Sequence, residues 1–307
     1  MTILVTGASG NTGRRVVDRL VAAGRRVRAM TRDPQSVPPR VGVEVVRGDF
    51  RRPETWPAVL DGVERIYLFP FVEVDGEPGG GFVDLAVGAG VRRFVVHSAA
   101  AAGFESADAP DDPQISALRR HLAEERSAHR AVERMVEASG AEWTHVRPGL
   151  LAVGALNWAD RIRSRQVVRA PYASAGFPWV HEADVADVAA AALLGDGHLG
   201  AAHTLTGPAK VSQAEQVAAI GAAIGLDLRF EELTPEQARD QWLADGYDRG
   251  TADWLIELLA AAVDGPDLLP PTDTYQRITG RPARTFAQWA VDHADDFRPT
   301  ARTGGVA

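Results

Sequence analysis

Cysteine is absent from the 307 residues of this chain, and lysine occurs once, as Lys210. Without cysteine the chain can form no disulfide, bind no zinc through thiolates and use no cysteine nucleophile. Lysine and arginine together number 33 against 41 aspartates and glutamates, which gives a formal net charge of -8. Because the arginines are mostly interleaved with carboxylates, this balance argues against nucleic acid as the main ligand.

Long apolar runs are also lacking. No stretch is long enough to cross a bilayer, and the N-terminus has no basic flank, apolar core and cleavage site of a signal peptide. We therefore expect a cytoplasmic protein that binds neither membrane nor nucleic acid. The eight histidines show no His-Glu-x-x-His spacing, so we expect no metal site, and no Gly-x-Ser-x-Gly elbow suggests a serine hydrolase.

The first half of the chain alternates short β-rich runs with helical patterns, which indicates βαβ units and a parallel sheet. The predicted strands are Thr2–Thr6, Arg26–Met30, Val43–Arg47, Arg65–Phe69, Arg92–His97 and Glu142–Arg147. The predicted helices between them are Thr12–Ala23, Pro53–Leu60, Gly81–Gly90 and about Gln114 to Ser139. Right-handed crossovers then give an α/β fold, a doubly wound parallel Rossmann sheet with a smaller mixed C-terminal domain.

The alternation breaks down after Arg147, where helical patterns dominate. Residues Asp184–Leu194 predict a helix that begins at an aspartate cap. Residues Ser212–Ile224 predict another, with Ser212 as the cap and Glu215 in the capping-box position. A further helix is expected from Thr251, and the segment "ARTFAQWAVDHADDF" predicts one amphipathic terminal helix.

Three glycines, Gly7, Gly10 and Gly13, lie where the first strand should end and the first helix begin. Glycine there lets the chain turn tightly, lets a pyrophosphate approach the backbone and lets the helix pack on the strand. Amides at the helix start then face the phosphates, so the first βα junction predicts nucleotide binding rather than a plain tight turn. The predicted contacts in this turn are Gly7, Ser9, Gly10, Asn11, Thr12 and Gly13.

The end of the second strand, ~20 residues past the glycines, is where this fold reads the ribose 2′ position. Arg32 occupies that place. A guanidinium suits a 2′-phosphate and has no acceptor for a hydroxyl, which favours NADP(H). Asp33 follows and keeps NAD open, although Pro34 turns the chain away. The alternative interpretation of Arg32 is a solvated loop arginine.

The stretch "VTGASGNTGRRVVDRL" resembles the short-chain dehydrogenase superfamily, whose extended and atypical branches carry the Gly-x-x-Gly-x-x-Gly spacing. "TRDP", "GAEWTHVRPG", "FPWVHEADVADVAAAAL" and "TGPAKVSQAEQVAAIGAAIG" look like the NmrA-like, quinone-oxidoreductase-2-like group of atypical members. Some members of that group reduce quinones or other small electrophiles with NADPH, and others bind NADP without turnover as redox-sensing regulators. The resemblance therefore implies fold and cofactor and leaves the activity open.

Further cofactor contacts follow from this resemblance. The turn Gly48-Asp49-Phe50 resembles the one that flanks the adenine in the superfamily, which implies that Asp49 and Phe50 lie there. Phe69 and Pro70, after the fourth strand, are expected on the adenine or ribose side, unless they only end the strand. Pro148, after the sixth strand, is expected at the edge of the nicotinamide pocket, unless it only redirects the chain.

The tyrosine and lysine that protonate the carbonyl in most short-chain dehydrogenases lie on the long helix after the fifth strand, and this chain lacks both there. Its tyrosines are Tyr67, Tyr172, Tyr247 and Tyr275. His129 falls about where relatives carry the lysine, and Glu125 and Glu133 could support an imidazolium. His129 therefore contacts the nicotinamide ribose or donates a proton, or it is a helix histidine paired with glutamate. Ser98 corresponds to a substrate-orienting serine, or clears space for the cofactor.

Ligands of doubly wound folds lie beyond the carboxyl ends of the strands, so the chain after Arg147 should close the pocket. The predicted walls are Leu150, Leu151, Trp158, Phe177, Trp179, Trp242 and Trp254. The tryptophans suit an aromatic or polycyclic compound, or they are core anchors. The few unpaired basic residues in this region argue against a phosphorylated substrate.

We expect an NADP(H)-dependent oxidoreductase that reduces a small apolar electrophile such as a quinone or enone. The alternative is a non-catalytic NADP(H)-binding redox sensor that acts through protein contacts, and an isomerase or dehydratase is disfavoured by the missing tyrosine. The expected NADP-binding Rossmann domain covers residues 1–149. The substrate-pocket region covers 150–297 and returns to the Rossmann core near 178–205, with a disordered tail at 298–307. A homo-oligomer is compatible with the sequence.

Overall fold

The computed structural model describes residues 1–69, 81–106, 108–264 and 268–298. Pro70 and residues 299–307 of the expected tail therefore lie outside the described residues. Within these ranges, no helix is both long and apolar enough to cross a membrane.

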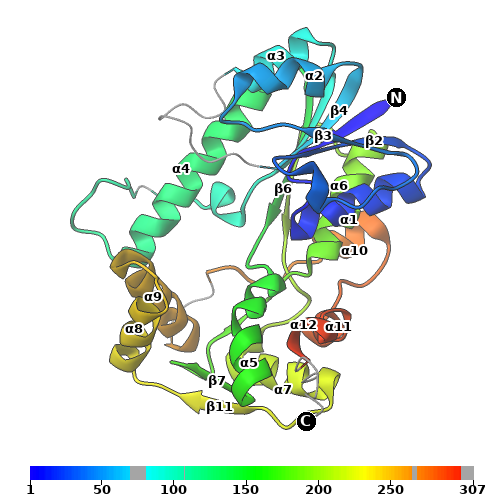
Figure 1. Cartoon of the computed structure of the whole chain (residues 1–307). Coiled ribbons are helices and arrows are strands. Elements are labelled where there is room, and N and C mark those ends of the chain that lie inside the picture. Colours follow the sequence, from blue (N-terminus) through cyan, green and yellow to red (C-terminus); the bar gives the residue numbers. More distant parts are fainter. Residues whose placement is uncertain (70–80, 107, 265–267, 299–307) are drawn as a thin grey trace.

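The centre of the described chain is a seven-stranded sheet in the order β3-β2-β1-β4-β5-β6-β9 (Figure 1). Its strands are β1 Thr2–Val5, β2 Arg26–Thr31, β3 Val43–Arg47, β4 Val63–Leu68, β5 Arg93–His97, β6 Glu142–Pro148 and β9 Ala201–Leu205. All neighbouring strands pair in parallel. The chain passes from β3 at one edge back to β4 on the far side of β1, so the switch point lies between β1 and β4. The predicted doubly wound Rossmann fold is confirmed.

Helices cover both faces of this sheet. Successive strand residues point to opposite faces, so Ile3 and Val5 pack against one set of helices and Leu4 against the other. The first set is α1 Asn11–Ala22 and α6 Glu182–Leu194, and the second is α2 Trp56–Leu60, α3 Phe82–Gly88 and α4 Ala117–Ala138 (Figure 1). Short 3-10 turns η1 Pro34–Ser36, η2 Pro53–Thr55 and η3 Ala100–Gly103 follow β2, β3 and β5.

The C-terminal region adds small sheets and helices beyond the carboxyl ends of the large sheet. Strands β8 Gly176–Phe177 and β10 Val211–Ser212 pair antiparallel, and β7 Val167–Ala170 and β11 Arg229–Glu232 pair in parallel. The helices are η4 Ala152–Trp158, α5 Ala159–Arg165, α7 Gln213–Ile224, α8 Pro235–Ala244, α9 Arg249–Asp264, α10 Thr274–Thr279, α11 Phe286–Asp292 and α12 Ala294–Phe297. Glu257 of α9 caps α4 by accepting hydrogen bonds from the amides of Ala117 and Leu118, at 3.2 and 2.8 Å.

The capping box predicted for α7 is confirmed: Ser212 Oγ accepts from the Glu215 amide at 3.3 Å, and Glu215 Oε2 accepts from the Ser212 amide at 2.8 Å. The aspartate cap predicted for α6 is wrong. The helix begins two residues earlier, where His181 Nδ1 accepts from the Ala183 amide at 3.1 Å. Asp184 is buried in the first turn instead, and accepts from the Arg284 amide at 2.8 Å.

The prediction of a single terminal helix is also wrong, because this C-terminal segment forms α11 and α12 with a break at His293. The His293 ring bonds Glu182 Oε1 through Nε2 at 2.7 Å and Asp296 Oδ2 through Nδ1 at 2.8 Å. A contact with α6, distant in the sequence, thus overrides a local helical pattern.

Candidate cofactor site and active site

The glycine-rich turn joins β1 to α1 at the switch point of the sheet. Gly7 has a φ of +62°, and the Gly10 amide donates to the Gly7 carbonyl at 3.0 Å. A Cβ on Gly13 would lie 2.1 Å from the Gly7 carbonyl oxygen, so any larger residue there would push α1 off the turn. The structure thus brings together the three glycines singled out in the sequence.

The start of α1 is open to a ligand. Gly10 is the N-cap and has no side chain with which to cap, and the first turn carries no acidic residue. The first amides of a helix have no acceptor within the helix, and the helix dipole favours negative charge there. Because Ser9, Gly10 and Asn11 are exposed beside these amides, the residues present fit a pyrophosphate group.

Phe69 lies across this turn, directly after β4. Its amide donates to Thr6 Oγ1 at 2.7 Å, and its Cβ is 3.0 Å from the place that a Cβ on Gly7 would take. The Phe69 side chain remains 41% exposed. An exposed aromatic ring therefore stands beside the glycine turn, near the switch point between β1 and β4.

The end of β2 presents a basic side chain beside the turn. Arg32 is exposed, while the Asp33 carboxylate accepts from the Gln35 amide at 3.1 Å and caps η1. The Thr31 hydroxyl oxygen accepts from the Asp33 amide at 3.2 Å and lies 3.5 Å from Ser9 Oγ. The Asp33 carboxylate thus has a local structural role, and the contact of Arg32 with a ribose substituent stays a prediction.

Asp49 and Phe50 shape the turn after β3. Asp49 Oδ1 accepts from the Arg51 amide and the Asp49 carbonyl accepts from Trp56 Nε1, both at 3.0 Å. The Phe50 ring meets Phe82 edge-on with centroids 5.0 Å apart. These contacts give both residues a structural role, and their contact with adenine stays a prediction.

A buried carboxylate lies beside Ser98 at the end of β5. Glu133 of α4 is fully buried, and accepts from Arg147 Nε and Nη2 at 2.8 and 2.7 Å. Burial alone would raise the pKa of Glu133, but hydrogen bonds from Arg147 and Arg130 lower it to about 2. The Arg147–Glu133 ion pair joins α4 to β6 immediately before the buried Pro148. It therefore fixes the position of α4 relative to the end of the sheet where Ser98 lies.

His129 lies one turn before Glu133 on α4 and is part-exposed. Burial lowers its pKa, and this outweighs the opposite effects of Glu125 and Glu133. Both glutamates favour the charged ring, as expected, but burial has the larger effect on its pKa. The lowered pKa favours the neutral imidazole, which can donate one hydrogen bond.

His97 is a site residue that the sequence analysis missed. It ends β5 next to Ser98, is 5% exposed, and places Nδ1 2.5 Å from the Tyr67 hydroxyl. Burial, with a smaller effect of His129, lowers the pKa of His97 to about 3, and burial raises that of Tyr67. Its ring centroid lies 5.0 Å from that of Phe69. The sequence feature that could have identified His97 is a polar residue in the apolar run of β5.

Glu133, Glu137 and His145 form a group whose ligand atoms all lie within 4.8 Å of one another. Arg130 pairs with both glutamates, and Arg147 pairs with Glu133. His145 Nε2 lies 3.0 Å from Glu137 Oε1. The two guanidinium groups already neutralise these carboxylates, so we assign the group a structural role and no metal.

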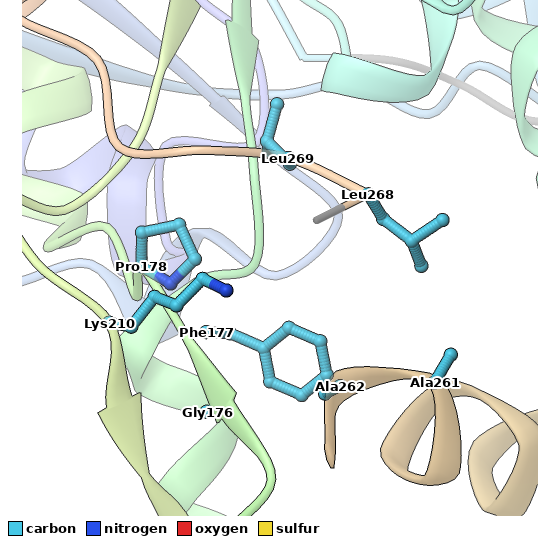
Figure 2. A pocket seen from close by; sticks show the side chains of 8 residues that line it. All are labelled: Gly176, Phe177, Pro178, Lys210, Ala261, Ala262, Leu268 and Leu269. Carbon is cyan, nitrogen blue, oxygen red and sulfur yellow. The ribbon is translucent and has the colours of Figure 1, made fainter. Parts of the chain in front are cut away.

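A small pocket of about 20 Å³ lies between β8, the loop before β10 and α9, and Figure 2 shows its walls. It is lined by Gly176, Phe177, Pro178, Lys210, Ala261, Ala262, Leu268 and Leu269. Of the predicted walls, Phe177 lines it, while Leu150, Trp179 and Trp242 pack behind it in the same apolar cluster. A Cβ on Gly149 would come within 2.6 Å of Leu269 Cδ2, so the pocket adjoins the end of β6.

The other predicted walls serve the core or the surface of the C-terminal region. Trp158 packs in a cluster with α5 and α7, Leu151 packs on the sheet, and Trp254 stacks on His121 with centroids 3.8 Å apart. Lys210, Leu268 and Leu269 also line the pocket but are not among the walls predicted from the sequence. The feature that distinguishes Lys210 in the sequence is that it is the sole lysine.

A parallel doubly wound sheet with an uncapped, glycine-rich first βα junction defines a dinucleotide-dependent α/β protein. The model of a family described as NAD(P)H-binding matches residues 7–196. The chain belongs to this NAD(P)H-binding family, as an NmrA-like, quinone-oxidoreductase-2-like atypical short-chain dehydrogenase.

Relatives that match almost the whole chain agree with this family assignment. The chain is 36% identical over 300 residues to an NAD(P)H azoreductase of Xenophilus azovorans, covering 96% of this chain and 99% of the relative. It is 38% identical over 302 residues to the (4-alkanoyl-5-oxo-2,5-dihydrofuran-3-yl)methyl phosphate reductase of Streptomyces griseus, covering 97% and 99%. The NADPH complex of the Escherichia coli quinone oxidoreductase QOR2 has the same fold, with a TM-score of 0.71, 23% identity and 94% and 99% coverage. The chain is accordingly an NAD(P)H-dependent reductase.

Proposed function

We propose that this protein uses NADPH to reduce a small, apolar, conjugated acceptor such as a quinone or an enone. One observation carries the proposal: the open glycine turn and the ends of β4, β5 and β6 lie at the same edge of the parallel sheet, and a small, largely apolar pocket adjoins the end of β6. The names of the azoreductase, of the furan phosphate reductase and of the quinone oxidoreductase support reduction of conjugated compounds.

NADPH rather than NADH is the proposed cofactor, because Arg32 is exposed at the ribose position and Asp33 caps η1. The exposed amides of the glycine turn would hold the pyrophosphate. The residues that we assign to cofactor binding are Gly7, Ser9, Gly10, Asn11, Thr12, Gly13, Arg32, Asp49, Phe50, Phe69, Ser98, His129 and Pro148.

Bound NADPH would supply a hydride, and one proton completes the two-electron reduction of a quinone to a hydroquinone. We assign Ser98 and His129 to the acceptor oxygen and that proton. A neutral His129 donates an N–H to the oxygen as negative charge develops there, and solvent can replace the proton because the ring is part-exposed. Tyr67 is buried and bonds His97, so it does not take the place of the missing tyrosine on α4.

The test is a tryptophan-fluorescence titration of cofactor-stripped protein with NADPH and NADH, for the wild type and Arg32→Asp. We expect at least about a tenfold preference for NADPH in the wild type, since a charge-assisted phosphate contact is worth roughly 1.5 to 3 kcal/mol. The preference should collapse in Arg32→Asp. Arg92→Asp is the matched control, because Arg92 is an exposed arginine at the opposite end of the strands.

A panel of quinones and enones then follows in the same cuvette, read at the NADPH absorbance. Acceptor-dependent oxidation supports the reductase. Tight NADPH binding with no oxidation across the panel would favour the non-catalytic sensor, and equal affinity for the two nucleotides would contradict the role of Arg32.

A further inference from the structure

We propose that His97 is a further cofactor-binding residue and that Tyr67 positions it. The Nε2–H group of His97 would donate a hydrogen bond to a phosphate or ribose oxygen in the nicotinamide half of the dinucleotide. This inference rests on the cofactor site of the proposed function, and it is independent of which acceptor is reduced.

His97 lies at the carboxyl end of the sheet, beside the glycine turn. It ends β5 and follows Val95 by two residues, so both side chains point to the face that α1 covers. The His97 ring centroid lies 5.0 Å from that of Phe69, whose Cβ is 3.0 Å from the place of a Cβ on Gly7. In a doubly wound fold, β1 to β3 and β4 to β6 each bind one nucleotide half. His97 therefore lies on the side of the nicotinamide half.

The hydrogen bond with Tyr67 determines which ring nitrogen carries the proton. Tyr67 is fully buried, and burial raises the pKa of its hydroxyl group. In the described part of the chain, the one hydrogen-bond partner of that hydroxyl is His97 Nδ1, 2.5 Å away. A buried hydroxyl that keeps its proton needs an acceptor, so Nδ1 accepts. Because burial, with a smaller effect of His129, lowers the pKa of His97 to about 3, the neutral ring carries its one proton on Nε2.

The Nε2–H group is a donor that awaits an acceptor. No group among the residues that the structure describes bonds Nε2, although His97 is only 5% exposed. The fully enclosed, unpartnered side-chain atoms of these residues do not include Nε2, so a ligand atom can reach it. Tyr67 pairs with Val95, deeper in the sheet than His97, and the two ring nitrogens point in different directions. Nε2 therefore faces away from the core, toward the carboxyl end where the cofactor would lie.

A hydrogen bond from His97 would hold the cofactor close to the acceptor. The next residue is Ser98, which we assign to the acceptor oxygen. A nicotinamide half that is bound by His97 would therefore lie beside the residue that orients the acceptor. The neutral ring also suits both forms of the cofactor, because an imidazolium at this place would repel the positively charged oxidised nicotinamide.

Two conservative variants separate the roles of the two ring nitrogens. The longer amide in His97→Gln can take the place of Nε2, whereas the shorter amide in His97→Asn can take only the place of Nδ1 beside Tyr67. Calorimetric titration measures the affinity for NADP⁺ and for 2′,5′-ADP, which lacks the nicotinamide half. We expect His97→Asn to weaken NADP⁺ binding about tenfold and to leave 2′,5′-ADP binding unchanged. His97→Gln should keep most of the affinity for NADP⁺.

His203→Asn is the matched control, because His203 is a part-exposed histidine on β9, at the edge of the sheet. Equal losses for the two ligands in His97→Asn, or a larger loss of NADP⁺ affinity in His97→Gln, would overturn the contact. A wild type that binds no dinucleotide would refute the cofactor site as well. If NADP⁺ binds and 2′,5′-ADP does not, the assignment of Arg32 fails, and NAD⁺ with AMP replaces the pair and decides the role of His97.

A measurement on the wild type decides the proposal even if a variant at this buried position does not fold. In protein with isotope-labelled histidine, long-range proton–nitrogen NMR correlations report the tautomer of each ring. Tyr67→Phe, which removes only the hydroxyl, identifies the His97 signals. We expect the proton on Nε2, and a shift of that signal with NADP⁺ but not with 2′,5′-ADP. A proton on Nδ1, or an Nε2 signal that NADP⁺ leaves unchanged, would overturn the proposal.

Discussion

Single residues decide whether the glycine turn can hold a nucleotide, and Gly13 has the strictest steric requirement. Its α-carbon packs so closely on the turn that a Cβ would lie 2.1 Å from the Gly7 carbonyl oxygen and 2.8 Å from its carbon. Both contacts are with backbone, which cannot turn aside as a flexible side chain can. The requirement for glycine is therefore steric, and it sits at the junction that presents the amides of α1.

We predict that Gly13→Ala lowers the free energy of unfolding by about 2 kcal/mol and weakens NADPH binding at least tenfold, because α1 must shift away from the turn. Urea denaturation and fluorescence titration measure the two effects. Gly88→Ala is the matched control, since nothing lies within 4 Å of a Cβ there. That substitution should be neutral or stabilise α3 by up to about 1 kcal/mol. Wild-type affinity in Gly13→Ala would contradict the assigned role of the turn.

Sequence reasoning could place on the fold those candidate residues whose position depends on a local pattern. The glycines, Arg32 and Ser98 follow strand ends that hydrophobic patterns mark, so their place on the sheet could be predicted. His97 and Lys210 acquire their surroundings from segments far away: Tyr67 is 30 residues from His97, and α9 lies some 50 residues beyond Lys210. A local sequence pattern cannot predict contacts between segments that are distant in the chain.

At the scale of elements, α6 is a buried helix held by charged side chains. Glu182 is fully buried and accepts from Arg15 Nη2 at 2.8 Å, His293 Nε2 at 2.7 Å and Trp289 Nε1 at 3.1 Å. Burial alone would raise the pKa of Glu182, but the neighbouring His181 ring and the hydrogen bond with His293 lower it. The network joins α1, α6 and α11, so the C-terminal helices are attached to the helix that carries the glycine turn.

A second buried acid of α6 extends this network. Asp187 accepts from the Tyr275 hydroxyl at 2.8 Å and from Arg284 Nη1 at 2.9 Å, and it also pairs with Arg19 of α1. Burial would raise the pKa of Asp187, but the hydrogen bonds from Arg19, Arg284 and Tyr275 lower it. Removing one partner from such a network leaves a buried charge, which costs more than breaking a surface ion pair.

His293 makes the stability of this network depend on pH. Burial would lower its pKa, but hydrogen bonds to Glu182 and Asp296 raise it, against a smaller opposing effect of Arg15. A histidine with a raised folded-state pKa stabilises most below its unfolded pKa of about 6.5, and the contribution is lost as pH rises through the folded-state value. The network should therefore be strongest in mildly acid solution.

We predict that His293→Gln lowers the free energy of unfolding by about 2 kcal/mol at pH 6, and that its difference from the wild type shrinks as pH rises toward 9. Urea denaturation across this range measures the difference. His198→Gln is the control, because His198 faces His203 rather than a carboxylate. A difference for His293→Gln that stays constant or grows with pH would show that the ring is not held as an imidazolium.

For the whole molecule, the accuracy of sequence-based prediction falls along the chain. Six strands of the parallel sheet and the helices between them follow from apolar periodicity. The strands β7, β8, β10 and β11, of two to four residues, are too short to carry a period, and the break between α11 and α12 depends on a contact with α6. The pocket beside Phe177 lies among these elements, so its walls could be predicted only in part.

The arrangement of the whole chain also explains how one fold can supply both cofactor and acceptor sites. The glycine turn and the ends of β4, β5 and β6 lie at one edge of the large sheet, and the C-terminal elements lie beyond that edge (Figure 1). Leu269 touches Gly149 where the two parts meet. The pocket that would choose the acceptor is thus built from a region separate from the nucleotide turn, so acceptor preference can vary while the cofactor site is kept.

A single-turnover reaction tests the proposed hydride transfer: protein loaded with NADPH, or with NADPH deuterated at the transferred position, is mixed with an excess of an acceptor. We predict that one NADPH is oxidised for each acceptor reduced, that this oxidation requires the acceptor, and that it is slower with the deuterated cofactor. NADPH that binds tightly yet stays reduced with every quinone, enone and azo compound offered would contradict this prediction.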